Sequence, residues 1–168
     1  KWNELQEYMK ENQDKNIITI AQTGMGKTEA GLLWIGNNKG FFTLPLRTAI
    51  NAIYKRITDD IIKVNIDDKV ALLHGDTYSK YLEKIDSEDM EIDIEEYYNK
   101  TKQWSLPLTV CTLDQVFDFV FRYRGFEPKL ATLSYSKVVI DEIQMYSSDL
   151  LAYLILGLSY ISKVGGKF

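Results

Sequence analysis

The sequence has 168 residues, of which 45% are hydrophobic and 26% charged, a composition typical of one soluble globular domain. Its single cysteine, Cys111, excludes an internal disulfide and fits a reducing compartment. The net charge of −4 argues against holding nucleic acid by bulk electrostatics, so any such contact must be local. The longest apolar stretch, residues 150 to 161, is shorter than the ~20 residues that cross a bilayer, and no secretory signal precedes Trp2. We therefore predict a cytoplasmic protein without a membrane partner.

The first two predicted elements are a helix at residues 2 to 12 and a strand at residues 17 to 20. The helix is amphipathic, because four apolar side chains recur at helical spacing: Trp2, Leu5, Tyr8 and Met9. The strand is indicated by a β-branched run. Together they bring the chain to its most informative segment.

Residues 21 to 28 read Ala-Gln-Thr-Gly-Met-Gly-Lys-Thr and join that strand to a helix-prone stretch. Gly24 and Gly26 lack side chains where backbone must close around a polyphosphate, and the first N–H groups of the helix would point at the anion. Lys27 can reach the β and γ phosphates, while the Thr28 hydroxyl can bind Mg²⁺. A glycine turn before an ordinary helix is the alternative, but the flanking elements favour a phosphate-binding loop. The predicted cofactor-binding residues of this loop are Gln22, Thr23, Gly24, Met25, Gly26, Lys27 and Thr28.

Three further apolar runs, at residues 41 to 44, 70 to 73 and 106 to 111, predict strands. Ligands of open α/β sheets bind at the carboxyl ends of the strands, so groups that follow these runs are placed to meet a phosphate backbone. The candidates are Pro45, Arg47, Thr48, Gly75, Thr112 and Gln115. An ordinary surface charge at Arg47 and a structural capping box formed by Thr112 and Gln115 stay open as alternatives.

Several other features have structural interpretations. His74 ends a strand with no second His or Cys near it, so we predict a structural role. Residues 86 to 96 carry seven acidic groups and are expected to form a solvated or mobile insertion. Residues 150 to 161 are apolar around most of a helix and are expected to be a buried helix. Residues 165 to 168 look like a turn that enters one more strand.

Residues 137 to 140 form an apolar strand that leads directly into Asp141-Glu142-Ile143-Gln144. Asp141 at the strand tip would hold Mg²⁺, and Glu142 would orient and deprotonate the attacking water. An Asp-Glu pair alone is common surface chemistry, but this context completes a nucleotide-hydrolysing site. The predicted catalytic residues are Lys27, Asp141 and Glu142, with Thr28 and Asp141 as the metal ligands.

These motifs resemble those of the first RecA-like domain of a superfamily 2 helicase, over nearly the whole chain. The matching segments are residues 21–28 (motif I), 45–48 (motif Ia), 112–115 (motif Ib) and 141–144 (motif II). Within that superfamily the chain is most similar to the CRISPR-associated helicase-nuclease of type I interference systems, on residues 44–51, 109–115 and 139–146. The resemblance implies an α/β fold with a three-layer parallel sheet, a RecA-like P-loop NTPase domain.

The resemblance also implies ATP and Mg²⁺ as cofactors, a single-stranded DNA track and translocation that feeds a nuclease during the degradation of invading DNA. Implied partners are a second RecA-like lobe, a nuclease domain and the CRISPR surveillance complex. Gln6 lies 21 residues before Lys27, where helicases of this kind read the adenine edge, although a solvated helix glutamine is equally open. Gln144 stands where members commonly carry His, at the position that couples γ-phosphate sensing to strand movement.

The single His cannot supply the nuclease's metal ligands, and motif III and the second lobe with its arginine finger would follow Phe168. We therefore expect residues 1–168 to be one truncated motor lobe, nearly inactive alone. Two other functions stay open: the first lobe of another superfamily 2 helicase that acts on RNA or DNA, and a nucleotide-binding interaction module without turnover. Complete Lys27, Thr28, Asp141 and Glu142 argue against the second.

Overall fold

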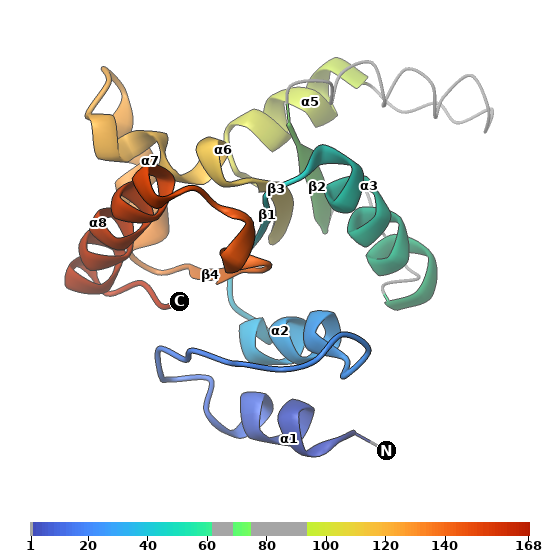
Figure 1. The fold of residues 1–168 in the computed structure, drawn as a ribbon. Coiled ribbons are helices and arrows are strands. Elements are labelled where there is room, and N and C mark those ends of the chain that lie inside the picture. The colour runs from blue at the N-terminus through green and yellow to red at the C-terminus, as the bar shows by residue number, and fades with distance from the viewer. Residues whose placement is uncertain (1, 62–68, 75–93) are drawn as a thin grey trace.

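The computed structural model describes residues 2–61, 69–74 and 94–168, and every structural statement below concerns these residues (Figure 1). In chain order the elements are α1 (Glu4–Glu11), α2 (Lys27–Ile35), β1 (Gly40–Leu44), α3 (Arg47–Arg56), the π-helical turn η1 (Ile57–Ile61), β2 (Val70–Leu73), α5 (Ile94–Lys102), β3 (Leu108–Thr112), α6 (Leu113–Phe117), η3 (Asp118–Phe121), α7 (Phe126–Leu133), β4 (Lys137–Ile140), η4 (Ile143–Met145) and α8 (Ser148–Val164). Within the described ranges, no helix has both the length and the apolar character that a membrane span needs.

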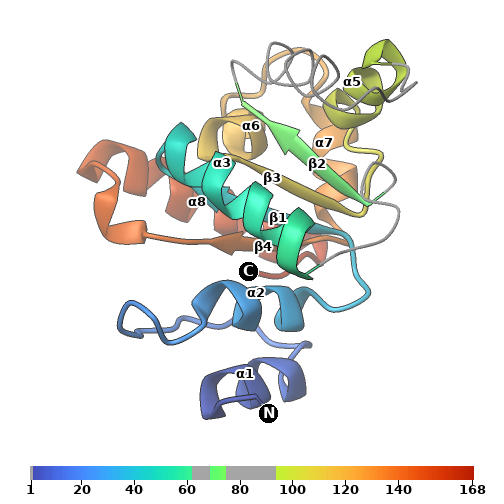
Figure 2. The ribbon, with the colours of Figure 1, turned by 90° about the vertical axis from the view of Figure 1, so that its right-hand side faces the viewer.

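The four strands form one parallel sheet in the order β2-β3-β1-β4. In its register, Leu44 lies opposite Thr112, and Thr43 lies opposite Ile140. The carboxyl ends of β1, β3 and β4 therefore meet at one edge of the sheet (Figure 2). This confirms the predicted parallel α/β fold and brings the segments after these strands to the same side.

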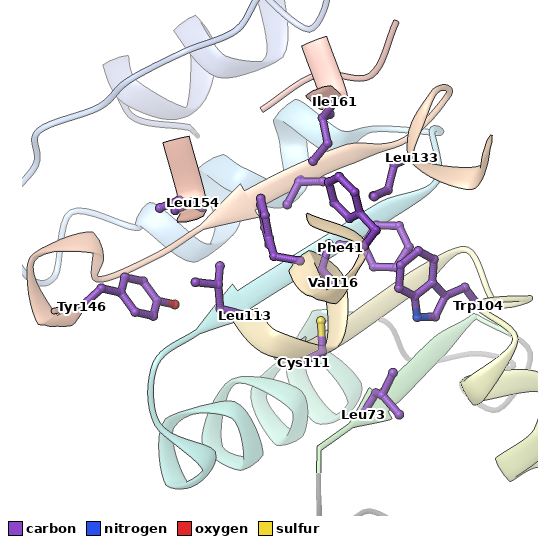
Figure 3. Close-up of a cluster of buried hydrophobic side chains, with 13 residues drawn as sticks. Phe41, Leu73, Trp104, Cys111, Leu113, Val116, Leu133, Tyr146, Leu154 and Ile161 are labelled. Atoms are coloured by element: carbon purple, nitrogen blue, oxygen red, sulfur yellow. The ribbon is translucent and has the colours of Figure 1, made fainter. Parts of the chain in front are cut away.

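Helices cover both faces of the sheet. Because successive side chains of a strand point to opposite faces, neighbouring residues of β1 pack in different cores. Phe42 packs in a core with Trp34 of α2 and Ile50 of α3. Its neighbour Phe41 packs in a second core, under α6, α7 and α8, that includes Leu133 (Figure 3). The predicted three-layer arrangement is therefore correct, and α1 packs on the outside against α2.

Two predictions are wrong, one about a strand and one about the burial of a helix. Residues 17–20 form no strand: Ile18 and Ile20 are 90% and 100% exposed. Within the described residues they belong to no strand of the sheet, and the N–H of Ile17 donates a backbone hydrogen bond to the carbonyl of Phe168. Helix α8 forms as expected but is buried on one face only: Leu154 and Ile161 are buried, whereas Ile155 is 68% exposed. Of the acidic stretch, residues 86–93 lie outside the described residues, as does Gly75.

Candidate nucleotide-binding site

The loop at residues 21–28 ends at the first residue of α2, with its two glycines in left-handed conformations. Gly24 has φ +85° and Gly26 has φ +72°, values that side chains rarely allow. Gly26 is the N-cap of α2, and no described side chain caps this helix start. The backbone N–H groups that begin α2 are therefore available to an anion, with the helix dipole behind them.

The loop lies next to the segment that follows β4. Lys27 Nζ is 3.7 Å from Glu142 Oε1, and both side chains are about one-third exposed. Asp141 follows the last residue of β4; its backbone N–H donates to the carbonyl of Thr43, and its side chain accepts from the backbone N–H of Glu142. The structure thus brings the three predicted catalytic residues to one edge of the sheet, although Lys27 and Asp141 are 114 positions apart in the sequence.

Glu142 is held by its backbone as well as by its neighbours. Its φ is +54°, in the left-handed region that a non-glycine residue seldom adopts, and such positions cluster at functional sites. Gln144 donates a hydrogen bond from Nε2 to Glu142 Oε2. Gln144 therefore contacts the carboxylate that we expect to activate water. The residue that stands in motif II where helicases of this kind commonly carry His is thus hydrogen-bonded to Glu142.

The residues present suit a magnesium-bound polyphosphate. Thr28, which follows Lys27 in the sequence, is buried, with 6% exposure. Oxygen atoms such as those of the Thr28 hydroxyl and the Asp141 carboxylate are the ligands that Mg²⁺ prefers. A methyl group added at Gly24 would meet nothing within 4 Å, so the loop has open space in front of it. Gln22, Thr23 and Met25 are exposed on the same loop. Their contact with nucleotide stays a prediction.

Gln6 of α1 lies against the phosphate loop. Its Nε2 atom is 2.5 Å from where a Cβ at Gly26 would stand. Asn3, which the sequence analysis missed, forms a capping box with Gln6 and donates from Nδ2 to the carbonyl of Met25 at 2.9 Å. The signal was in the sequence, since Asn followed three residues later by Gln is a capping-box pattern. Gln6 therefore has a structural role here, and its proposed contact with adenine stays untested.

The predicted nucleic-acid residues are distributed along the carboxyl edge of the sheet. Arg47 and Thr48 open α3 and are exposed, and Pro45 before them is half-buried. Thr112 is the N-cap of α6 but is buried and makes no side-chain capping bond. Gln115 donates a hydrogen bond to the Asp114 carboxylate instead, so Thr112 and Gln115 do not form a capping box. The adjacent carboxylate is nearer to the Gln115 side chain than the backbone N–H of Thr112, which a capping box would use. Their contact with nucleic acid stays a prediction.

His74 has the structural role that the sequence predicted. It is buried at the end of β2, and its Nε2 lies 3.0 Å from Asn51 Oδ1 of α3. Within residues 2–61, 69–74 and 94–168, no group of three His, Cys, Asp or Glu side chains is arranged to hold a metal ion. A nuclease-type metal cluster therefore has no counterpart in this part of the chain.

The pattern of one protein family, described as DEAD/DEAH box helicase, matches residues 3–159. The chain belongs to the DEAD/DEAH box helicase family. Membership in this family implies nucleotide binding. Across the sheet β3, β1 and β4 lie in that order, so residues 112–115, 45–48 and 141–144 follow one another at its carboxyl edge in another order than in the sequence.

Two curated relatives of this helicase domain bear names of one kind. One, a CRISPR-associated nuclease/helicase Cas3 of Methanothermobacter thermautotrophicus, is 29% identical over 155 residues, which cover 91% of this chain and 18% of the relative. The other, a putative CRISPR-associated nuclease/helicase Cas3 of Methanocaldococcus jannaschii, is 28% identical over 155 residues, 86% of this chain and 21% of the relative. The chain thus spans about a fifth of the length of these relatives.

A solved structure shares the fold of this helicase domain. The crystal structure of T. fusca Cas3 superimposes with a TM-score of 0.78 over 99% of this chain and 20% of that chain. The sequence identity is 20%, so the likeness speaks for the fold. It agrees with the parallel three-layer sheet described above.

Proposed function

We propose that the chain is the ATP-binding first motor lobe of a CRISPR-associated helicase that moves along single-stranded DNA. One observation carries the proposal: Lys27, the first residue of the uncapped helix α2, has its Nζ 3.7 Å from Glu142 Oε1, so that phosphate-binding and water-activating groups share one site. The names of both curated relatives support the CRISPR-associated assignment over another superfamily 2 helicase. A second RecA-like lobe, a nuclease domain and a CRISPR surveillance complex are the proposed partners.

The residues divide the chemistry between them. The α2 N-terminus and Lys27 bind and orient the phosphates, and Thr28 and Asp141 would hold Mg²⁺, which withdraws charge from the phosphate oxygens when bound. Glu142 takes a proton from water, acting as a general base. Gln144 holds the Glu142 carboxylate through Oε2, which leaves Oε1 facing Lys27.

Calorimetry with Mg·ATP tests the binding part of the proposal. Lys27→Ala should weaken binding by roughly 1.5–3 kcal/mol, because it removes a charge-assisted contact with the phosphates. Lys55→Ala is the matched control: Lys55 is an exposed lysine in the last turn of α3, and its loss should leave the affinity unchanged. Equal affinities of the Lys27→Ala variant and the unmodified chain would remove the proposal.

Hydrolysis assays test the remaining part. An arginine finger from a partner lobe is worth ~10³–10⁵ in rate in GTPases, so we expect residues 1–168 to bind Mg·ATP but hydrolyse it very slowly. Glu142→Gln should abolish the remaining turnover and leave nucleotide binding nearly intact, because Glu142 acts on water. Brisk hydrolysis stimulated by single-stranded DNA in the isolated chain would contradict the proposal of half a motor, and stimulation by RNA alone would favour another helicase class.

A further inference from the structure

Three aromatic side chains form an exposed patch where η3 packs beside α8. Phe121, Tyr123 and Tyr153 are 50%, 68% and 44% exposed. The rings of Phe121 and Tyr123 stack, with their centroids 5.8 Å apart and their planes inclined by 29°. The ring of Tyr153 lies 4.9 Å from that of Phe121, at an interplanar angle of 48°. The three rings, here called the aromatic platform, therefore form one continuous surface across two elements of the fold.

Arginines alternate with the aromatic residues of this segment. Residues 121 to 126 read Phe-Arg-Tyr-Arg-Gly-Phe, with two positive charges and no acidic residue, in a chain whose net charge is −4. The first five of these residues are exposed. Of the acidic residues that flank the segment, Asp118 is paired with Lys129, and Glu127 lies in the first turn of α7. The segment is therefore a local positive site of the kind that an acidic domain needs to contact a phosphate backbone.

The fold holds the aromatic platform in place without a ligand. Arg122 has φ +53°, in the left-handed region, so the chain turns between Phe121 and Tyr123. Its guanidinium group donates a hydrogen bond to the Tyr160 hydroxyl at 3.2 Å and lies 5.9 Å from the centroid of the Tyr160 ring. Figure 1 shows the segment between α6 and α7 at the periphery of the molecule, away from α2 and α3. A ligand would thus meet rings that are already ordered, which lowers the entropic cost of binding.

We propose that the aromatic platform binds unpaired bases of a single-stranded nucleic acid by stacking, while Arg124 contacts a phosphate. An exposed cluster of aromatic rings marks an interaction site, and every base has a flat face that can stack on such rings. A protein partner would also cover the rings, but the alternating guanidinium groups match a ligand that carries phosphates. The length of α6 separates the platform from the carboxyl edge of the sheet. The inference therefore goes beyond the proposed function and requires neither nucleotide nor translocation.

Fluorescence anisotropy of a labelled thymidine strand, about 12 nucleotides long, tests the proposal at low salt and without nucleotide. Tyr123→Ala should weaken binding by about 5- to 150-fold, the range expected from the loss of one stacked base. Tyr123→Trp should retain binding, because an indole ring also stacks on bases. Tyr135→Ala is the matched control: Tyr135 is 63% exposed beyond the other end of α7, and its loss should leave the affinity unchanged.

Two further strands separate stacking from charge. A strand of the same length whose internal bases are replaced by abasic sites keeps its phosphates, so it should bind more weakly than the thymidine strand and show no effect of Tyr123→Ala. Arg124→Gln should weaken the binding of both strands and reduce the steepness of log affinity against log salt by about 0.7, the value of one phosphate contact. A uridine strand should bind within a few-fold of the thymidine strand, because stacking does not read the 2′-hydroxyl.

Equal affinities of the unmodified chain and Tyr123→Ala for the thymidine strand would overturn the proposal. An equal loss in Tyr135→Ala, or no binding by the unmodified chain, would overturn it as well. Self-association that Tyr123→Ala abolishes, with unchanged affinity for DNA, would assign the platform to a protein partner instead. Calorimetry with Mg·ATP should give the same affinity for Tyr123→Ala and the unmodified chain, because Tyr123 lies outside the phosphate loop and motif II. Failure of the platform would therefore leave the ATP-binding proposal standing.

Discussion

Gly26→Ala should destabilise the folded chain more than Gly24→Ala, although both glycines lie in the phosphate loop with positive φ. At Gly24 the added methyl meets nothing within 4 Å, so backbone strain is the only cost. At Gly26 the methyl would stand 2.5 Å from Nε2 of Gln6, closer than any real contact, and Gln6 must move. That movement breaks its capping box with Asn3 at the start of α1.

The magnitudes follow from these two terms. Left-handed backbone costs an L-residue roughly 1–2 kcal/mol, which is the whole expected effect at Gly24. Loss of the capping interaction adds about 0.5–2 kcal/mol, so Gly26→Ala should cost about 1.5–4 kcal/mol. Gln6→Ala alone should cost the capping share. Added to Gly26→Ala it should cost almost nothing further, because the capping box is already lost there.

Urea unfolding followed by tryptophan fluorescence measures all four variants, with buried Trp34 as a reporter in the core beside α2. The slope of the free energy of unfolding with urea should be unchanged, so the midpoints can be compared directly. Equal costs at Gly24 and Gly26, or additive costs of Gly26→Ala and Gln6→Ala, would refute the role assigned to Gln6 against the loop.

Two further predictions concern packing and pH. Gly157→Ala in α8 should lower the free energy of unfolding in urea by about 1–2 kcal/mol. Its methyl group would stand 2.3 Å from Cδ1 of Phe117, and this overpacking costs more than alanine gains over glycine in a helix. An unchanged midpoint would show that α6 moves aside without cost. Burial lowers the pKa of Lys137 below its ordinary value of 10.5, against a smaller opposing effect of Asp14. The unfolded chain therefore binds more protons than the folded chain just below pH 10.5. The free energy of unfolding of the unmodified chain, measured relative to that of Lys137→Met, should rise as the pH is raised through that window. A fall of this difference with rising pH would contradict the prediction.

The sequence predicted the strands that pair in the described sheet and failed for residues 17–20, which belong to no strand of it. β1, β2 and β3 were found from short apolar runs, because these strands are buried on both faces. Residues 17–20 carry the same signal but form no strand, since pairing depends on a partner that composition cannot reveal. The helix at 150–161 was placed correctly, but its burial was overestimated, since Ile155 is 68% exposed and lines a cavity of about 550 Å³.

The candidate site was predictable in its members and not in its contacts. Motif spacing identified Lys27, Asp141 and Glu142, because carboxyl ends of parallel strands must meet. It could not show that Lys27 faces Glu142, nor that Gln144 holds the other oxygen of that carboxylate, since both depend on the left-handed backbone at Glu142. Asn3 was missed because a capping pattern reports on helix ends, whereas its contact with Met25 is a tertiary one.

The weakness of the Lys27–Glu142 pair is what makes it suitable for a nucleotide site. Both side chains are about one-third exposed and their charges are 3.7 Å apart, so the pair contributes only ~0–1 kcal/mol to stability. Several phosphate charges in front of the α2 N-terminus compete with a single carboxylate for Lys27, with the helix dipole on their side. When Lys27 turns to the phosphates, Glu142 loses its cationic partner but keeps the hydrogen bond from Gln144. In the proposed reaction Lys27 would therefore pass to the phosphates while Gln144 keeps the Glu142 carboxylate in place.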